Sequence, residues 1–216
     1  MFALGMTACQ KTDALENGTN DGTATVTVTA ALPAEMAETR VAGDGTTVDR
    51  CIMQIYIGDE LYGEPQYAQV QDLKAAFSAR LIAGKTYDLV FWADKAGTDI
   101  KTDLHYDTGD LNKVVFKGDY AGNDETRDAF FGSVQVVADQ SKAVSVELRR
   151  PFGQLNVKTL DLAEVKAAAP SLEPRKVTVA FKNVPTGINL RTGELNSDTS
   201  SITYVEAVNL AGTDGE

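Results

Sequence analysis

The sequence predicts an all-β protein, built as a sandwich of antiparallel sheets. Short segments in which apolar and polar residues alternate follow one another along most of the chain. Such alternation is typical of strands that bury one face. The period of an amphipathic helix is nearly absent, and the one helix expected lies at residues 160–169, where Pro170 ends it. Closely spaced strands without helices between them favour a sandwich over an α/β fold.

The N-terminal residues resemble the end of a bacterial lipoprotein signal. Residues 4–9 read LGMTAC, so small residues precede Cys9. No basic residue precedes Cys9, and we expect the upstream part of the signal to lie before this start. Residues 10–22 are polar and aperiodic, as in a flexible tether. Residues 1–22 are therefore expected to be a signal remnant and tether, with lipid on Cys9 holding the protein at the outer membrane. The alternative is an ordinary N-terminus with a chance cysteine.

The first strand opens a domain expected at residues 23–150. Residues 23–30 alternate between threonine and small apolar residues. This pattern places Ala24, Val26, Val28 and Ala30 toward a core and the threonines toward solvent.

Further strands of this domain follow at short spacing. Residues 51–57 are apolar at nearly every position and predict a central strand. Strands are also expected at residues 75–81, 86–93, 112–117, 129–138 and 142–148. In the second of these, Tyr87, Leu89, Phe91 and Ala93 share one face, whereas Trp92 points to the other.

The remaining residues, 151–216, are expected to form a second sandwich domain. Strands are predicted at residues 154–158, 176–182 and 202–208, with Val177, Val179 and Phe181 pointing inward. This unit is shorter than the roughly 100 residues of a typical sandwich. We therefore expect it to be partial.

Composition excludes several classes of function. The 216 residues carry a net charge of -11. This charge disfavours binding to nucleic acid and to anionic lipid head groups. No apolar run approaches the ~20 residues of a membrane-spanning helix. Cys51 lies within an apolar strand and reads as a small buried hydrophobe; a disulfide between Cys9 and Cys51 is the alternative.

Residues that carry catalysis are not evident, and we expect no enzyme and no cofactor or metal. His105 is the only histidine and lies in a polar loop, where a surface role is expected. The acidic residues 119–125 lack EF-hand spacing and read as a solvated loop. Alternation separates Trp92 from Tyr87 and Phe91, which favours core packing over a sugar site.

Four segments, in this order, resemble the fimbrillin family, the subunits of type V pili of Gram-negative bacteria. Residues 38–45 read ETRVAGDG, and residues 87–93 read YDLVFWA. Residues 127–132 read RDAFFG, and residues 146–155 read VELRRPFGQL. The last segment is the most specific, because it joins the final strand of one domain to the first strand of the next.

This resemblance implies two stacked, transthyretin-like Greek-key sandwiches in a pilus subunit that serves adhesion. It implies export as a lipoprotein, followed by a cut after Arg40 by an arginine-specific protease, so that Val41 becomes the new first residue. The first strand would then leave, and a strand of another pilus subunit would fill its groove.

Physical chemistry is consistent with this implication. A removable edge strand leaves unpaired backbone groups and an apolar groove, which a donor strand can satisfy again. Burying four side chains such as Ala24, Val26, Val28 and Ala30 contributes on the order of 4–8 kcal/mol. Arg40 can also be read as an ordinary solvated loop residue.

Two questions stay open in the sequence. The C-terminal end is short and polar, so the donor strand lies beyond residue 216, or the chain is an accessory, tip or anchor subunit. The alternative function is a lipid-anchored surface module that binds a glycan or a protein and does not polymerise.

Overall fold

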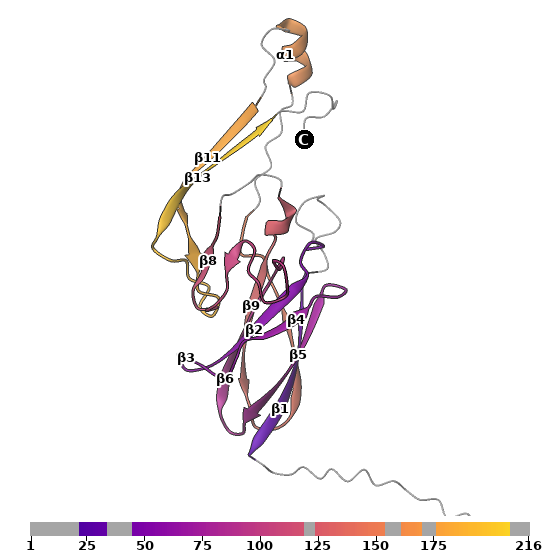
Figure 1. Cartoon of the computed structure of the whole chain (residues 1–216), viewed down its shortest axis with the longest axis vertical. Coiled ribbons are helices and arrows are strands. Elements are labelled where there is room, and N and C mark those ends of the chain that lie inside the picture. Colours follow the sequence, from indigo (N-terminus) through magenta and orange to yellow (C-terminus); the bar gives the residue numbers. More distant parts are fainter. Residues whose placement is uncertain (1–21, 34–44, 119–123, 154–160, 170–175, 208–216) are drawn as a thin grey trace, which may run out of the picture.

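The computed structural model describes residues 22–33, 45–118, 124–153, 161–169 and 176–207 (Figure 1). Within them the chain is almost entirely β. The strands are β1 (Thr23–Ala31), β2 (Arg50–Ile57), β3 (Glu60–Leu61), β4 (Gln66–Gln69), β5 (Lys74–Ile82), β6 (Thr86–Asp94), β7 (Tyr106–Asp107), β8 (Val114–Phe116), β9 (Phe130–Val137), β10 (Lys142–Glu147), β11 (Lys176–Pro185), β12 (Gly187–Ile188) and β13 (Thr199–Ala207). A 3₁₀ turn, η2 (Glu125–Arg127), and one helix, α1 (Leu162–Ala168), accompany them. The predicted fold class is confirmed.

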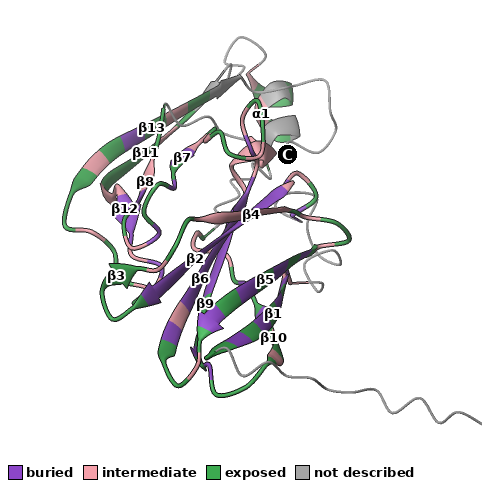
Figure 2. Ribbon diagram, turned by 60° about the horizontal axis from the view of Figure 1, so that its bottom comes forward, coloured by how far each residue is buried: buried purple, intermediate pink, exposed green. Residues whose placement is uncertain are grey.

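Two sheets form a sandwich. One has the order β10-β1-β5, and the other has the order β3-β2-β6-β9 with β4 also paired to β2. Their facing sides enclose the inner core, to which every second residue of β1 and β5 contributes. Alternation along these strands is visible as stripes of buried and exposed residues (Figure 2). Most pairings are antiparallel, but β1 and β10 run parallel.

A third layer covers the other face of the second sheet. The short sheet β12-β8-β7 packs there, and with β2, β6 and β9 it encloses the outer core. The outer core consists of Ile52, Tyr56, Val90, Trp92, Tyr106, Leu111, Val114, Ala129, Phe131, Ile188 and Leu190. Because β2 and β6 are covered on both faces, nearly all their residues are buried, as apolar runs without alternation predict.

Two strands of the chain's last third, β11 and β13, stand apart from the sandwich sheets. β11 and β13 pair with each other in an antiparallel ribbon, which extends away from the sandwich together with α1 (Figure 1). Phe181 is 37% exposed, so its predicted inward orientation is wrong. Among the described strands no second sheet covers the ribbon, which leaves such apolar side chains in solvent. The strand predicted at residues 154–158 lies outside the described residues.

Strand β12 links the chain's last third to the sandwich. It pairs with β8 through Gly187↔Val115 and Ile188↔Val114. The predicted domain boundary near residue 150 stays a prediction.

Candidate strand-exchange site

Strand β1 lies in the middle of its sheet, not at an edge. Each of its residues pairs with β5, from Thr23↔Ile82 to Ala31↔Lys74. On its other side, Val26 to Ala31 pair in parallel with β10. The expectation of a removable edge strand is therefore wrong. If β1 left, it would open two edges at once, one on β5 and one on β10.

The inward side chains of β1 are those that the sequence predicts. Relative exposures are 2% for Ala24, 0% for Val26, 2% for Val28 and 0% for Ala30. They face the inner core together with residues of β2, β6 and β9. The threonines between them are exposed. Amphipathic alternation thus places four apolar side chains of β1 into one continuous core.

The two ends of β1 are held differently. At the start of the strand, the Thr25 N–H donates to Ser141 Oγ at 3.0 Å rather than to a backbone carbonyl. At the far end, the Leu148 N–H donates to the Ala31 carbonyl and the Leu32 N–H donates to the Leu73 carbonyl, both at 2.8 Å. Leu32 is also buried. The end of β1 is therefore fixed on both sides, and its alternation continues to Leu32, beyond the residues 23–30 that the sequence predicts.

The positions at which the protein would be lipidated and cut lie outside the described part of the chain. These are Cys9 in the tether, and Arg40 with Val41 in segment 34–44. The segment's far end is placed: the Gly45 N–H donates to Asp128 Oδ2 at 3.0 Å. Asp128 is held in turn by Arg150, whose Nε and Nη2 donate to Oδ1 at 2.8 Å and Oδ2 at 3.0 Å.

Cys51 is a free, fully buried thiol in the inner core. Burial raises the pKa of this thiol, and the nearby charge of Asp94 raises it further. A neutral thiol in an apolar core is a small hydrophobe, as the sequence indicates. Cys9, the partner in the alternative disulfide, lies outside the described residues.

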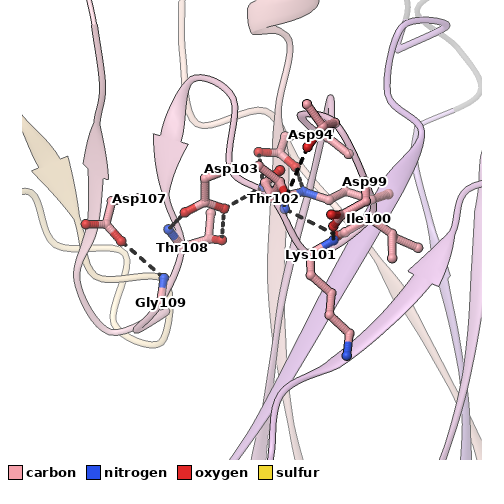
Figure 3. Close-up of polar contacts among 12 residues, drawn as sticks. Asp94, Asp99, Ile100, Lys101, Thr102, Asp103, Asp107, Thr108 and Gly109 are labelled. Carbon is pink, nitrogen blue, oxygen red and sulfur yellow. Dashed lines mark hydrogen bonds and ion pairs between the residues drawn. The ribbon is translucent and has the colours of Figure 1, made fainter.

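A buried charge network that the sequence reasoning missed lies at the start of β2, where Arg50 is the first residue. Arg50 Nε and Nη2 donate to Asp94 Oδ1 and Oδ2 at 2.6 Å and 3.0 Å, and Nη2 also donates to Asp103 Oδ1 at 2.8 Å. Arg50 Nη1 donates to the Thr102 carbonyl at 3.2 Å. Asp103 also accepts from the Thr108 N–H and hydroxyl (Figure 3). The network ties the loop between β6 and β7 to the sandwich.

The electrostatics of this network indicate a structural role. Burial alone would lower the pKa of Arg50, but hydrogen bonds and charges of Asp94 and Asp103 raise it above its ordinary value. A guanidinium with all these donors satisfied offers no proton for catalysis. One sequence signal was available: Arg50 and Asp94 are charged residues that directly flank the strands predicted at residues 51–57 and 86–93.

His105 is more enclosed than its loop sequence indicates. Its Nε2 lies 2.7 Å from the Thr126 hydroxyl and 3.9 Å from Asp124 Oδ2. Burial and the nearby Arg127 lower the pKa of His105, while Asp124 opposes this shift. His105 is therefore partly buried rather than fully at the surface, because its ring nitrogen contacts Thr126 of η2.

Other kinds of site find little support in the described residues. Trp92 is fully buried in the outer core, where its ring contacts Tyr106 edge to face. No three described His, Cys, Asp or Glu side chains gather as metal ligands would. No described helix is long and apolar enough to cross a bilayer. A small open pocket of about 140 Å³ lies beside β12, lined by Asn112, Asn189 and Asn196 among others.

The sequence was compared with protein families and with curated proteins. Residues 17–214 match the model of a family described as "Family of unknown function (DUF6562)". Among curated proteins, none matches the sequence significantly.

Several solved structures are similar in fold. A "putative adhesin" from Bacteroides ovatus has a TM-score of 0.52 at 13% identity, over 85% of this chain and 62% of that one. "Putative polysaccharide binding proteins (DUF1812)" from Bacteroides thetaiotaomicron give 0.49 at 11% identity, over 83% and 64%. "The fimbrial anchor protein Mfa2" from Porphyromonas gingivalis gives 0.45 at 14% identity, over 88% and 70%. The chain spans less than two thirds of the length of the first two.

Proposed function

The chain belongs to the DUF6562 family, whose function is unknown, and we propose that it is a structural, accessory or anchor subunit of a bacterial cell-surface pilus. In this proposal it is not an enzyme. It assembles with other pilus subunits by exchange of β1 for a donor strand, and the assembled fibre serves adhesion. Its fold, shared with a structure described as a "putative adhesin", supports a place at the cell surface.

The position of β1 carries the proposal. β1 completes the sheet between β5 and β10 and fills the inner core with four apolar side chains. It also precedes every other described strand, so within the described fold it is covalently joined to the rest only through segment 34–44. A single cut in that segment would turn β1 into a separate peptide held by hydrogen bonds and burial alone. Such a peptide can be replaced by another strand with the same pattern.

The energetics permit exchange without spontaneous loss. Burial of the four side chains contributes on the order of 4–8 kcal/mol. Unpaired edges on β5 and β10 would add the cost of unsatisfied backbone groups. Ala24 and Ala30 contribute least to this burial, so Val26 and Val28 hold most of β1 in the inner core.

Two processing steps complete the proposal. Lipid on Cys9 would anchor the precursor in the outer membrane, and an arginine-specific protease would cut after Arg40. The described contacts on either side of segment 34–44 support such a cut, because both flanks are fixed to the body while the cut falls between them.

Limited digestion of the folded protein with an arginine-specific protease tests the proposal. We expect a new N-terminus at Val41 and a ladder of detergent-resistant oligomers on an unboiled gel. Arg40→Lys is the matched control, because it keeps the charge and removes the cleavage site. Resistance at Arg40 with a protein that stays monomeric would contradict strand exchange.

The pocket beside β12 favours a second candidate, a lipid-anchored module that binds a hydroxyl-rich ligand such as a glycan. Asn112 and Asn189 bring side-chain amides to this pocket, whereas Asn196 already binds the Gly187 N–H and the Thr186 hydroxyl. The exposed Leu195 lines the same pocket, and amides beside an apolar side chain suit a ligand with hydroxyl groups. Titration of the protein with oligosaccharides, followed by NMR shifts of the Asn112 and Asn196 amides, tests this candidate.

A further inference from the structure

The inward alternation of β1 continues one position beyond the strand, to Leu32. Leu32 is 4% exposed and belongs to the inner core, like the residues at 24, 26, 28 and 30. It is larger than any of these. Its N–H donates to the Leu73 carbonyl at 2.8 Å, so its backbone is bonded to the residue that precedes β5. The groove therefore has a fifth, terminal subsite.

One wall of this subsite is a turn in an unusual conformation. Asp72 and Leu73 have φ values of 50° and 58°, which residues other than glycine rarely adopt. Two hydrogen bonds between Gln71 and Lys74 close the turn. A leucine in this region is strained and persists only where the surrounding structure holds it. This turn conformation directs the Leu73 carbonyl toward the Leu32 N–H.

The opposite wall is formed by Gly45 and Phe130. Gly45 has a φ of +76°, and a Cβ there would lie 3.2 Å from Leu32 Cδ2 and 3.3 Å from Phe130 Cε2. The backbone of Gly45 is fixed to Asp128, which Arg150 holds through two hydrogen bonds. The walls come from segments far apart in sequence and are fixed independently of Leu32. A cavity left by a smaller side chain could not collapse easily.

We propose that this terminal subsite selects and retains the strand bound in the groove. The inference rests on the proposed function. The partner it requires is a strand with small or β-branched apolar residues at four alternating positions and a leucine-sized residue at the fifth. Because the subsite lies on the β1 side of segment 34–44, a cut in that segment leaves Leu32 bound. Cleavage alone then does not release β1, and an incoming strand has to displace Leu32.

The first test uses the intact full-length chain with Cys9→Ser, so that Cys51 reports opening of the inner core. We expect Leu32→Ala to raise the rate of Cys51 labelling by about 100-fold, and the matched Val28→Ala by about 10-fold. Burial of one extra methylene alone would separate the two by only about fourfold. Leu32→Met should restore slow labelling. Equal rates for Leu32→Ala and Val28→Ala would overturn the inference.

The second test separates this inference from the proposed function. The chain is cut at Arg40, stripped of β1 and offered labelled peptides that span residues 23–33, with leucine or alanine at position 32. We expect the alanine peptide to leave about 100-fold faster. If neither peptide enters, strand exchange itself fails, and the labelling rates of the intact chain still decide the role of Leu32. If both peptides leave at the same rate, the terminal subsite does not select its strand.

Discussion

A buried ion pair stabilises a fold no more than well-packed apolar residues of similar volume would. Removing one partner is costly, however, because the other charge stays buried without compensation. Arg50 and Asp94 are both fully buried and bind each other through two hydrogen bonds. Lys95 and Asp49 form a second ion pair, one residue beyond the end of β6 and one before the start of β2, but both side chains are partly exposed. The two pairs therefore offer a direct comparison between buried and exposed charges in one region.

We expect Arg50→Met to lower the free energy of unfolding by about 3–5 kcal/mol, because Asp94 would remain buried without its partner. Lys95→Met, the matched control, should change it by about 1 kcal/mol or less. Urea denaturation followed by Trp92 fluorescence measures both. Equal effects of the two substitutions would show that the Arg50 network is dispensable.

His105 gives the protein a pH dependence of stability near neutrality. Burial lowers its pKa below the ordinary value of 6.5, so the folded state resists protonation that the unfolded state accepts. The free energy of unfolding should therefore fall as the pH drops below about 6.5, until the folded ring is also protonated. The lowered pKa values of Asp103 and Asp124 act only near and below 3.8.

We expect His105→Gln to flatten the stability profile between pH 7 and pH 5, since glutamine can donate to the Thr126 hydroxyl without titrating. Urea midpoints at several pH values, compared between parent and variant, measure the effect. An unchanged slope in this window would assign the pH dependence to other groups.

At the scale of elements, the sequence predicts strands well and their neighbours poorly. The alternation of residues 23–30 and the apolar run of residues 51–57 correspond to β1 and β2, and the side chains face as predicted. The partners of β1 could not be predicted, because Ala30 and Val146 pair across more than a hundred residues and alternation says nothing of neighbours. Short pieces such as β7 and β12 carry too few residues for a periodic signal.

Strand β12 depends on a glycine. A Cβ on Gly187 would lie 2.6 Å from the Val114 carbonyl, a backbone atom that cannot move aside without breaking the β12–β8 pair. Gly109, in the loop before β8, has only Asp107 Oδ1 at 3.5 Å. An alanine side chain would therefore clash at Gly187 but would fit at Gly109.

We expect Gly187→Ala to lower the free energy of unfolding by about 2 kcal/mol or more through strain and lost burial of Ile188. Gly109→Ala should stay within about 0.5 kcal/mol of the parent. Chemical denaturation measures the free energies, and hydrogen exchange at the Ile188 amide shows whether β12 has detached. Similar values for both variants would mean that β12 is not needed.

At the scale of the whole molecule, the chain's last third contributes to the sandwich rather than only following it. Ile188 and Leu190 belong to the outer core with Trp92, and the Leu190 N–H donates to the Leu111 carbonyl at 3.0 Å. Arg191 forms an ion pair with Asp59 beside the end of β2. By contrast, β11 and β13 pair only with each other among the described strands. These two parts should therefore differ sharply in what their removal costs.

A chain that ends at residue 150 should lose stability and bind a dye specific for exposed apolar surface, because it lacks Ile188 and Leu190 over the outer core. The matched control ends at residue 198, which removes β13 but keeps β12 and the Asp198 carbonyl that accepts from the Thr186 N–H. We expect this control to keep the cooperative unfolding of the sandwich, followed by Trp92 fluorescence. A stable chain ending at residue 150 that binds no dye would instead make the first 150 residues an independent domain. If the chain ending at residue 150 is unstable and binds the dye, the sandwich that holds β1 needs residues from both sides of the predicted domain boundary.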